Sequence, residues 1–279
     1  MSTNSSQFGK YLTLVSNNPK KQRAFYVGDS WFQYPLRRYA DLQTRIDTQF
    51  RNDMLGLDDS FPGRDADETM GLIGRWRGFA SALAEMRKPF NVICVSMGGN
   101  DIIGKDFATH LFKKPTQQPN LEWPWSPTIP AIAETRINLA SLLRAFDTIA
   151  FAYGLIITLR NDLAPKATVI THTYADVTPS NTPYTFPGIK TGPWIWKPLT
   201  DAGIKDEAVQ REISRWLLLS FANLLKAVAK GKQKVAVLDS RLELPDFDGW
   251  WDNEIHPLGP GFKLLAEEYW FPAVEKALK

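Results

Sequence analysis

The sequence predicts an α/β protein in which helices cover both faces of a parallel sheet. Five short apolar runs rich in β-branched residues have the length of buried strands, and segments with helical spacing of apolar residues separate them. Strands that alternate with helices form parallel sheets with right-handed crossovers. A chain of 279 residues is long enough for one large α/β domain, which we expect to span residues 1–279.

The expected strands and helices alternate along the chain. The strand-like runs are residues 24–27, a weaker run at 53–57, 91–96, 168–173 and 234–238. The helical patterns are residues 35–46, 67–86, 132–161, 205–229 and 262–277. In the first helical pattern, apolar residues recur at helical spacing at Leu36, Tyr39, Leu42 and Ile46. Each strand is therefore followed by a helix, as a parallel sheet requires.

Two stretches rich in proline and tryptophan interrupt this alternation, at residues 105–130 and 176–200. Their large aromatic residues are Phe107, Phe112, Trp123 and Trp125 in the first and Tyr184, Phe186, Trp194 and Trp196 in the second. Each stretch follows the carboxyl end of an expected strand, so both should lie over the same edge of the sheet. As a group they are candidate walls of a substrate cleft, and the four tryptophans are candidate substrate contacts. Any one of these rings could instead pack its insertion onto the body.

Composition and charge argue against several other classes of protein. The chain has 33 basic and 30 acidic residues, and its longest basic runs are the pairs Lys20-Lys21, Arg37-Arg38 and Lys113-Lys114. This distribution argues against a nucleic-acid-binding stripe. The single cysteine, Cys94, lies in the apolar run 92–95, which predicts a buried side chain and does not suit a reactive thiolate.

The sequence offers no clear membrane or metal signal. Residues 1–10 are polar and lack the apolar core of a signal peptide. No stretch reaches the roughly 20 apolar residues of a membrane span, and the longest candidate, 145–159, contains Asp147 and is interpreted as a buried helix. Neither a His-Glu-x-x-His motif nor a Cys/His cluster occurs. We therefore expect a cytoplasmic protein without a membrane span, a metal or another cofactor.

Three motifs carry the chemistry. Gly28-Asp29-Ser30 ends the first strand-like run, Gly98-Gly99-Asn100-Asp101 follows the third, and His256-Pro257 lies near the C-terminus. A serine at the carboxyl end of a buried strand is held by the sheet and exposed at its edge, where open α/β sheets place their chemistry. A histidine has the unperturbed pKa to take the serine's proton near neutral pH. Together the motifs indicate a serine hydrolase, and the absence of a Gly-x-Ser-x-Gly elbow argues against the α/β-hydrolase fold.

These motifs resemble those of the SGNH/GDSL hydrolase family, from about residue 24 to residue 271. The resemblance implies a flavodoxin-like, three-layer fold with strand order 2-1-3-4-5. It also implies Ser30 as nucleophile, His256 as base, and an oxyanion hole formed by Ser30, Gly63 and Asn100. Gly56 is the competitor of Gly63 for that role. Asp29 and Asp101 are expected to accept hydrogen bonds from loop amides and hold their neighbours in place.

The histidine block departs from the family's Asp-x-x-His pattern, because the residue three before His256 is Asn253. Asp252 is the first candidate for the group that orients the imidazole, since a one-residue bulge could bring its carboxylate to the ring. Asn253 could supply an amide carbonyl instead, as an asparagine does in cysteine proteases. Glu254 is a third candidate.

The other histidines have weaker claims. His110 lies in the first insertion, and His172 ends the fourth strand-like run, where a structural hydrogen bond is the simpler interpretation. His172 and Trp31 are retained as candidate substrate contacts beside the nucleophile.

The function expected from these motifs is hydrolysis of a small-molecule carboxylic ester through an acyl-enzyme. The substrate stays open among short-chain acyl esters, acetylated carbohydrates and lysophospholipids, and the oligomeric state is unassigned. The alternative is a noncatalytic carbohydrate- or ligand-binding module, which the altered acid position would favour.

Overall fold

The structure is a computed structural model that describes residues 3–34, 40–119, 121–126, 128–186, 189–245 and 249–279. Its centre is a five-stranded parallel sheet with the order β2-β1-β3-β4-β7. The strands are β1 (Gln22–Gly28), β2 (Met54–Asp58), β3 (Val92–Ser96), β4 (Thr168–His172) and β7 (Val235–Leu238). The α/β class predicted from the sequence is confirmed, and so is the order 2-1-3-4-5 that the family resemblance implies.

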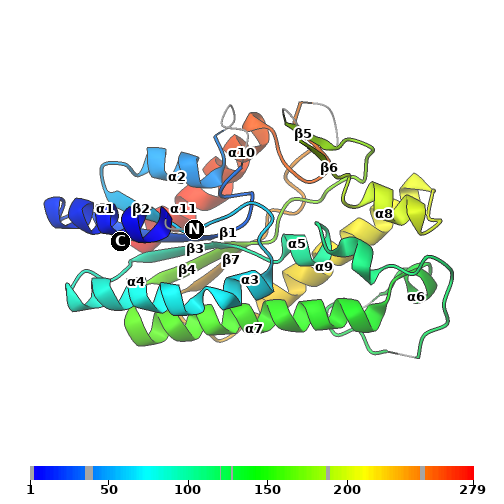
Figure 1. Cartoon of the computed structure of the whole chain (residues 1–279), viewed down its shortest axis with the longest axis horizontal. Helices are drawn as coiled ribbons and strands as arrows, with labels where there is room; N and C mark the ends of the chain where they lie inside the picture. The colour runs from blue at the N-terminus through cyan, green and yellow to red at the C-terminus, as the bar shows by residue number, and fades with distance from the viewer. Residues whose placement is uncertain (1–2, 35–39, 120, 127, 187–188, 246–248) are drawn as a thin grey trace.

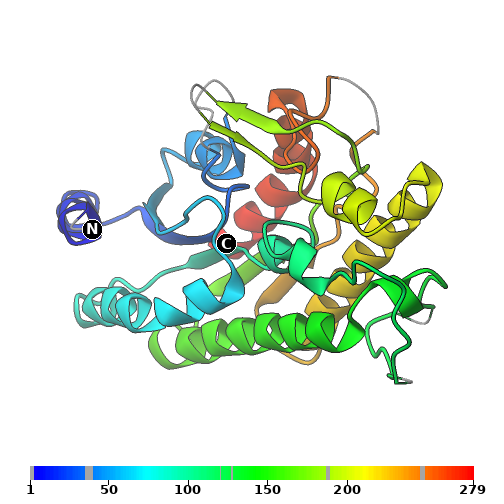
Figure 2. The ribbon, with the colours of Figure 1, turned by 45° about the vertical axis from the view of Figure 1, so that its right-hand side comes forward.

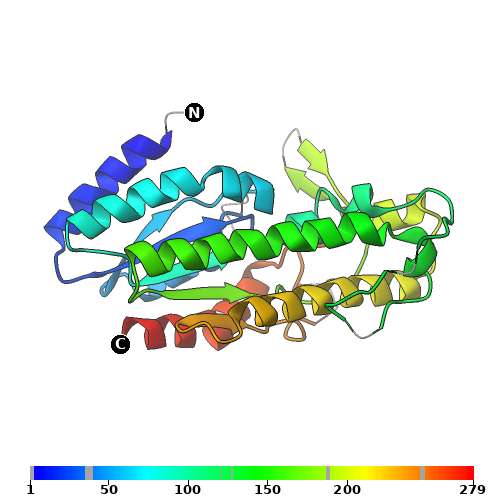
Figure 3. The ribbon, with the colours of Figure 1, turned by 90° about the horizontal axis from the view of Figure 1, so that it is seen from below.

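Helices cover both faces of the sheet, and Figures 1 and 3 show the two layers. One layer contains α2 (Leu42–Gln49), α10 (Gly259–Leu265) and α11 (Phe271–Leu278), the last two joined by the wider turn η2 (Ala266–Trp270). The other contains α3 (Ala66–Gly71), α4 (Ile73–Glu85), α7 (Leu139–Leu163) and α9 (Glu207–Ala229). The contacts of α7 with α3, α4 and α9 join the second layer.

Polar side chains that cap the helices move several expected boundaries. The carboxylate of Asp41 accepts a hydrogen bond from the Thr44 N–H, so α2 begins at Leu42, and the expected part at 35–39 lies outside the described residues. Asn138 caps α7 in the same way and separates it from the short α6 (Ala133–Arg136). The expected helix 67–86 is likewise two helices that meet at Leu72.

The elements that were not predicted from the sequence include an N-terminal helix and a strand pair. Helix α1 (Thr3–Asn17) lies beside the edge strand β2, where Tyr11 and Val15, four residues apart, are buried and the Tyr11 hydroxyl donates to the Leu55 carbonyl. The strands β5 (Tyr184–Phe186) and β6 (Ile189–Thr191) form an antiparallel pair within the second insertion. Its three-residue strands are too short for a periodicity signal.

Helix α7 has the length and composition of a membrane span, with a mean hydropathy of 1.6 over its most apolar window. About 39% of that window is buried inside the protein, and the helix packs against α3, α4 and α9. A helix in the core of a protein can have the same length and hydropathy, so these two properties are weak evidence for a membrane span.

The carboxyl ends of the strands lie at the end of the molecule from which both insertions extend, as Figures 1 and 2 show. At this end β1 and β3 approach closely, because a Cβ on Gly28 would lie 2.2 Å from the carbonyl oxygen of Ser96. Only glycine fits this contact, which fixes the path of the chain just before Ser30. Cys94 is fully buried on β3, and burial raises the pKa of its thiol, as a packing role requires.

Candidate active site

The loop after β1 is held by the buried carboxylate of Asp29. One oxygen accepts hydrogen bonds from the Trp31 N–H, at 3.0 Å, and from the Ser96 hydroxyl, at 2.8 Å. The other accepts from the hydroxyl of Tyr174. Burial raises the pKa of Asp29 to about 6, while these hydrogen bonds oppose the rise. The side chain that precedes Ser30 is therefore anchored in the core, as expected.

Ser30 and His256 form a hydrogen bond across 226 positions of sequence, with 2.7 Å between Oγ and Nε2. The other ring nitrogen, Nδ1, lies 2.9 Å from the Oδ1 oxygen of Asn253. That oxygen also accepts from the backbone N–H groups of Ile255 and His256, so it is the amide's oxygen that faces the ring. Nδ1 must then carry the proton, which leaves Nε2 to accept the proton of Ser30.

Asn253, rather than Asp252 as we expected, supplies the oxygen that faces Nδ1 of the imidazole. The Asp252 backbone N–H donates to the His256 carbonyl, and Trp251 pairs with Pro257, which closes a narrow loop. In this loop Asn253 points inward to Nδ1. The Asp252 carboxylate instead accepts from the Tyr34 hydroxyl, at 2.5 Å, and from the Asn253 amide, at 3.3 Å.

Glu254 does not reach the ring either. Its buried carboxylate accepts hydrogen bonds from the backbone N–H groups of Ser180, Ile195 and Trp196. It therefore anchors the second insertion to the loop 251–257 that carries His256, called the base loop below. Burial raises the pKa of Glu254 to about 7.

Gly63 and Asn100 line the same cavity as Ser30, and two hydrogen bonds join the loops that carry them. The Asn100 amide donates to the Arg64 carbonyl, at 3.0 Å, and the Asp101 carboxylate accepts from the Ala66 N–H, at 3.1 Å. Within the described part of the chain, no acceptor pairs with the backbone N–H of Ser30 or Gly63. Gly56, the competitor, lies on β2 against Asp47 and Tyr26 and outside this site.

These side chains line a cavity of about 270 Å³. Its lining residues are Ser30, Tyr34, Pro62, Gly63, Asn100, Lys105, Tyr184, Thr191, Trp194, Ile255 and His256. Trp194 packs on His256 in an edge-to-face arrangement, with 5.7 Å between the ring centroids and 82° between the ring planes. The second insertion thus forms a wall of the cavity, as expected, through Tyr184, Thr191 and Trp194.

The other candidate aromatic contacts are not among the residues that line this cavity. Trp123 is buried against Trp216 and donates to the Ser220 hydroxyl, and Trp125 packs on the same core. Trp31 is buried against His172 and Phe262, and Trp196 begins α8 (Trp196–Asp201). Trp123 and Trp125 thus pack the first insertion onto the protein, which is the alternative that the sequence left open, and Trp31 is likewise buried in the core.

The two remaining histidines have structural hydrogen bonds. His172 is 1% exposed, and its Nε2 lies 2.9 Å from the Ser96 hydroxyl that donates to Asp29. It therefore belongs to the buried hydrogen-bond network that holds Asp29, the residue before Ser30. His110 bridges the Asp101 carbonyl and the Ser141 hydroxyl.

Burial lowers the pKa of His256 to about 3. The neutral ring can accept a proton, and the same burial makes the imidazolium that then forms costly unless other groups stabilise it. Tyr34, whose ring centroid lies 4.8 Å from that of His256, is a site residue that the sequence did not indicate. Its contact with Asp252 joins positions 218 residues apart, which no local pattern records.

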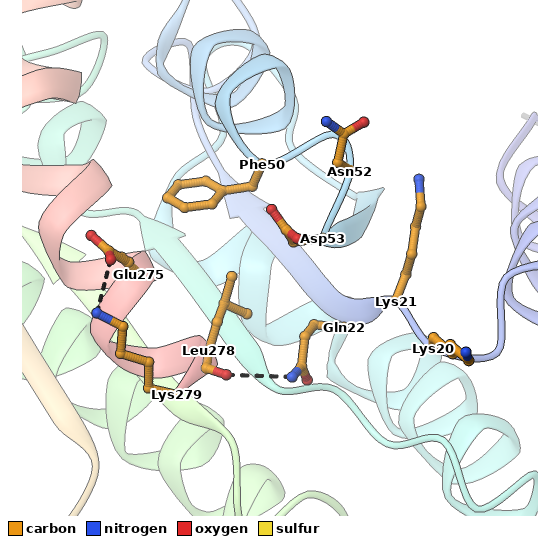
Figure 4. A pocket seen from close by; sticks show the side chains of 9 residues that line it. All are labelled: Lys20, Lys21, Gln22, Phe50, Asn52, Asp53, Glu275, Leu278 and Lys279. Carbon is orange, nitrogen blue, oxygen red and sulfur yellow. Dashed lines mark hydrogen bonds and ion pairs between the residues drawn. The ribbon is translucent and has the colours of Figure 1, made fainter.

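A larger cavity, of about 490 Å³, lies near the amino ends of β1 and β2 (Figure 4). Its lining residues are Lys20, Lys21, Gln22, Phe50, Asn52, Asp53, Glu275, Leu278 and Lys279. The Gln22 amide donates to the Leu278 carbonyl and Lys279 pairs with Glu275 there, but the lining holds no serine, cysteine or histidine. Among the described residues, no group of three or more His, Cys, Asp and Glu side chains is placed to bind a metal ion.

No protein-family model and no curated protein sequence matches the chain. Solved structures do. An extracellular lipase from Streptomyces rimosus is 12% identical, with a TM-score of 0.51 over 92% of this chain and 99% of that one. A lipase from a goat rumen metagenome is 12% identical, with a TM-score of 0.51 over 93% of this chain and 100% of that one.

A carbohydrate esterase of family 3 from Talaromyces cellulolyticus is 10% identical, with a TM-score of 0.51 over 92% of this chain and 98% of that one. At identities this low, the structural match establishes a shared fold alone. The chain therefore has the lipase and esterase fold that its resemblance to the SGNH/GDSL hydrolases implies.

Proposed function

We propose that the protein is a serine esterase that hydrolyses carboxylic esters through an acyl-enzyme on Ser30. The observation that carries the proposal is the 2.7 Å hydrogen bond between Ser30 and the unprotonated Nε2 of His256. The contact of Nδ1 with Asn253 sets this tautomer, so the ring is already in the form that accepts a proton.

In the first half-reaction, Ser30 Oγ attacks the carbonyl carbon of the ester, and its proton passes to Nε2 of His256. The oxyanion that forms would accept hydrogen bonds from the N–H groups of Ser30 and Gly63 and from the amide of Asn100. The imidazolium then gives its proton to the oxygen of the leaving alcohol as that C–O bond breaks.

In the second half-reaction, water attacks the acyl-enzyme and gives a proton to Nε2. Breaking of the Ser30 ester bond releases the carboxylic acid, and the proton returns to Ser30 Oγ. No metal or redox step is needed to balance this sequence.

The size and lining of the cavity support a small ester. At about 270 Å³ it lies below the roughly 300–1,000 Å³ of typical ligand sites, and aromatic rings of Tyr34, Tyr184 and Trp194 narrow it. We therefore propose a substrate with a short acyl group. A noncatalytic binding module, by contrast, would have no use for a paired serine and histidine.

Hydrolysis of p-nitrophenyl acetate, butyrate and octanoate by the purified protein tests the proposal. Wild-type protein should turn over the shorter esters faster, and Ser30→Ala should lower kcat by about 10⁴-fold or more. Ser141→Ala is the matched control, because Ser141 is hydrogen-bonded to His110 at 2.9 Å but lies outside the cavity. Equal turnover by Ser30→Ala and wild type would refute the assignment, and no turnover by either would favour the binding module.

A further inference from the structure

The base loop holds a carboxylate one residue away from the side chain that contacts the catalytic histidine. We propose that Asp252 orients His256 through Asn253, so that Asp252, Asn253 and Tyr34 form a carboxylate–amide relay of positioning residues. The kinetic test of this relay rests on the proposed function. A spectroscopic test does not depend on it.

The hydrogen bonds around the Asn253 amide fix its orientation. Its oxygen accepts from three N–H groups, those of Ile255, the His256 backbone and the His256 ring. Its NH₂ group faces the Tyr34 hydroxyl at 3.1 Å and the Asp252 carboxylate at 3.3 Å. Donors surround one side of the amide and acceptors the other, so the side chain can adopt only one orientation.

Tyr34 holds the Asp252 carboxylate in place. The Tyr34 hydroxyl donates to the same Asp252 oxygen that the Asn253 amide faces. Burial raises the pKa of Tyr34, and the hydrogen bond to Asp252 raises it further, so the phenol keeps its proton and stays a donor. The ring of Tyr34 also packs against the imidazole, with 4.8 Å between ring centroids, so the residue that anchors Asp252 contacts His256 as well.

The charge of Asp252 can stabilise the positive charge that His256 acquires during the reaction. When Ser30 transfers its proton, His256 becomes an imidazolium in a buried site, where a positive charge is costly. An amide oxygen offers a partial negative charge, and a carboxylate hydrogen-bonded to the other end of the amide strengthens its polarisation. The Asp252 carboxylate accepts no proton in this scheme. It stabilises the charge on His256 without touching the ring.

The relay also explains the residue order of the block. An aspartate at position 253 would lack the NH₂ group that faces Asp252 and Tyr34, and it would place two carboxylates on adjacent residues. An asparagine at 253 avoids that repulsion while a carboxylate stays within the network.

A double-mutant cycle on kcat tests the coupling. Asp252→Asn should lower kcat by about ten- to a hundredfold, less than the roughly ten-thousandfold of an aspartate that contacts its histidine directly. In an Asn253→Ala background, the same change should alter kcat by less than about twofold, because the connecting amide is gone. Asp201→Asn, which removes an exposed carboxylate, is the control and should have no effect. The relay would be overturned if the effects of the two single substitutions on kcat multiplied in the double variant. It would also be overturned if Asp252→Asn left kcat unchanged.

A reversal of sign sharpens the test. In an Asn253→Asp background, Asp252→Asn should leave kcat unchanged or raise it, because it removes a like charge beside the new carboxylate. Asp252→Asn that stays as harmful in this background as in wild type would show a structural role and contradict the proposal.

The spectroscopic test is the downfield ¹H NMR resonance of the His256 Nδ1–H, assigned by its loss in His256→Gln. It should move upfield in Asp252→Asn and, by less, in Tyr34→Phe, which also serves if Asp252→Asn does not fold. Glu254→Gln makes the same change of a buried carboxylate two residues away and should leave the resonance in place. An unmoved resonance in folded Asp252→Asn and Tyr34→Phe proteins would overturn the relay even if the protein hydrolyses esters. A moved resonance without any turnover would contradict only the proposed function.

Discussion

The loop that carries Ser30 and the loop that carries His256 use the same local device with different residue types. In the nucleophile loop the Asp29 carboxylate accepts from the N–H two residues ahead, and in the base loop the Asn253 amide does the same. The difference lies on the other side of each group. Asp29 faces two hydroxyl donors in the core, whereas Asn253 faces a carboxylate and a phenol oxygen.

This difference shows what selects an acid or an amide at each position. A carboxylate only accepts hydrogen bonds, so it suits Asp29, whose partners all donate. Asn253 must accept from His256 and donate toward Asp252, and only an amide does both. The charge near His256 therefore stands one residue earlier in the chain.

Apart from loss of the proposed nucleophile itself, the largest effect is expected at Asn100. Replacing Asn100 by Ala should lower kcat by about a hundred- to a thousandfold with little change in KM, because its hydrogen bond to substrate forms mainly in the transition state. Steady-state kinetics on a short p-nitrophenyl ester give both constants. The fall should exceed that of Asp252→Asn. A change confined to KM would instead make Asn100 a ground-state binding residue.

A smaller effect, on stability, should distinguish Asp29 from the amide of the base loop. Because the pKa of Asp29 is raised to about 6 in the folded protein, the folded state binds more protons than the unfolded state between about pH 4 and pH 6. Its contribution to stability is thus present at low pH and is lost as the pH rises through 6.

Asp29→Asn removes this dependence, so the free energy of unfolding of the variant relative to wild type should rise by roughly 1–3 kcal/mol from pH 4 to pH 7. Urea unfolding at several pH values measures it. The buried histidines titrate in both proteins, so their contributions cancel in the difference. Parallel pH profiles for the two proteins would show that Asp29 keeps an ordinary pKa.

The smallest effect concerns Trp194, which joins the second insertion to the base loop. Trp194→Ala should raise KM by about tenfold and leave kcat nearly unchanged, because the ring lines the cavity and has no proton to transfer. Trp123→Phe is the matched control in the first insertion and should leave KM unchanged, since Trp123 is buried on Trp216. A large fall in kcat for Trp194→Ala would show that its contact with His256 positions the base.

The sequence was informative where a function depends on neighbours along the chain. Gly28-Asp29-Ser30 could be placed at a strand end because an apolar run precedes it, and the strand order followed from the family resemblance. The resemblance also brought His256 to Ser30, although 226 positions separate them.

The sequence was less informative where contacts between distant segments determine the position of a side chain. The choice of Asp252 over Asn253 failed because the pairing of Trp251 with Pro257 turns residue 253 inward, and spacing alone does not record that turn. Tyr34 was missed because its partners lie at the other end of the chain. Trp123 and Trp194 look alike in sequence, and only the packing of each insertion separates a core ring from a cavity wall.

The most direct test of the account is covalent labelling with a fluorophosphonate, which reacts with a serine activated by a neutral base. Intact-protein mass and peptide mapping should show one phosphonyl group on Ser30 of the wild-type protein and of Ser141→Ala. His256→Gln, which removes the base, should label far more slowly. Absence of an adduct on folded wild-type protein, or an adduct on another serine, would contradict the claim that Ser30 and His256 form a catalytic pair.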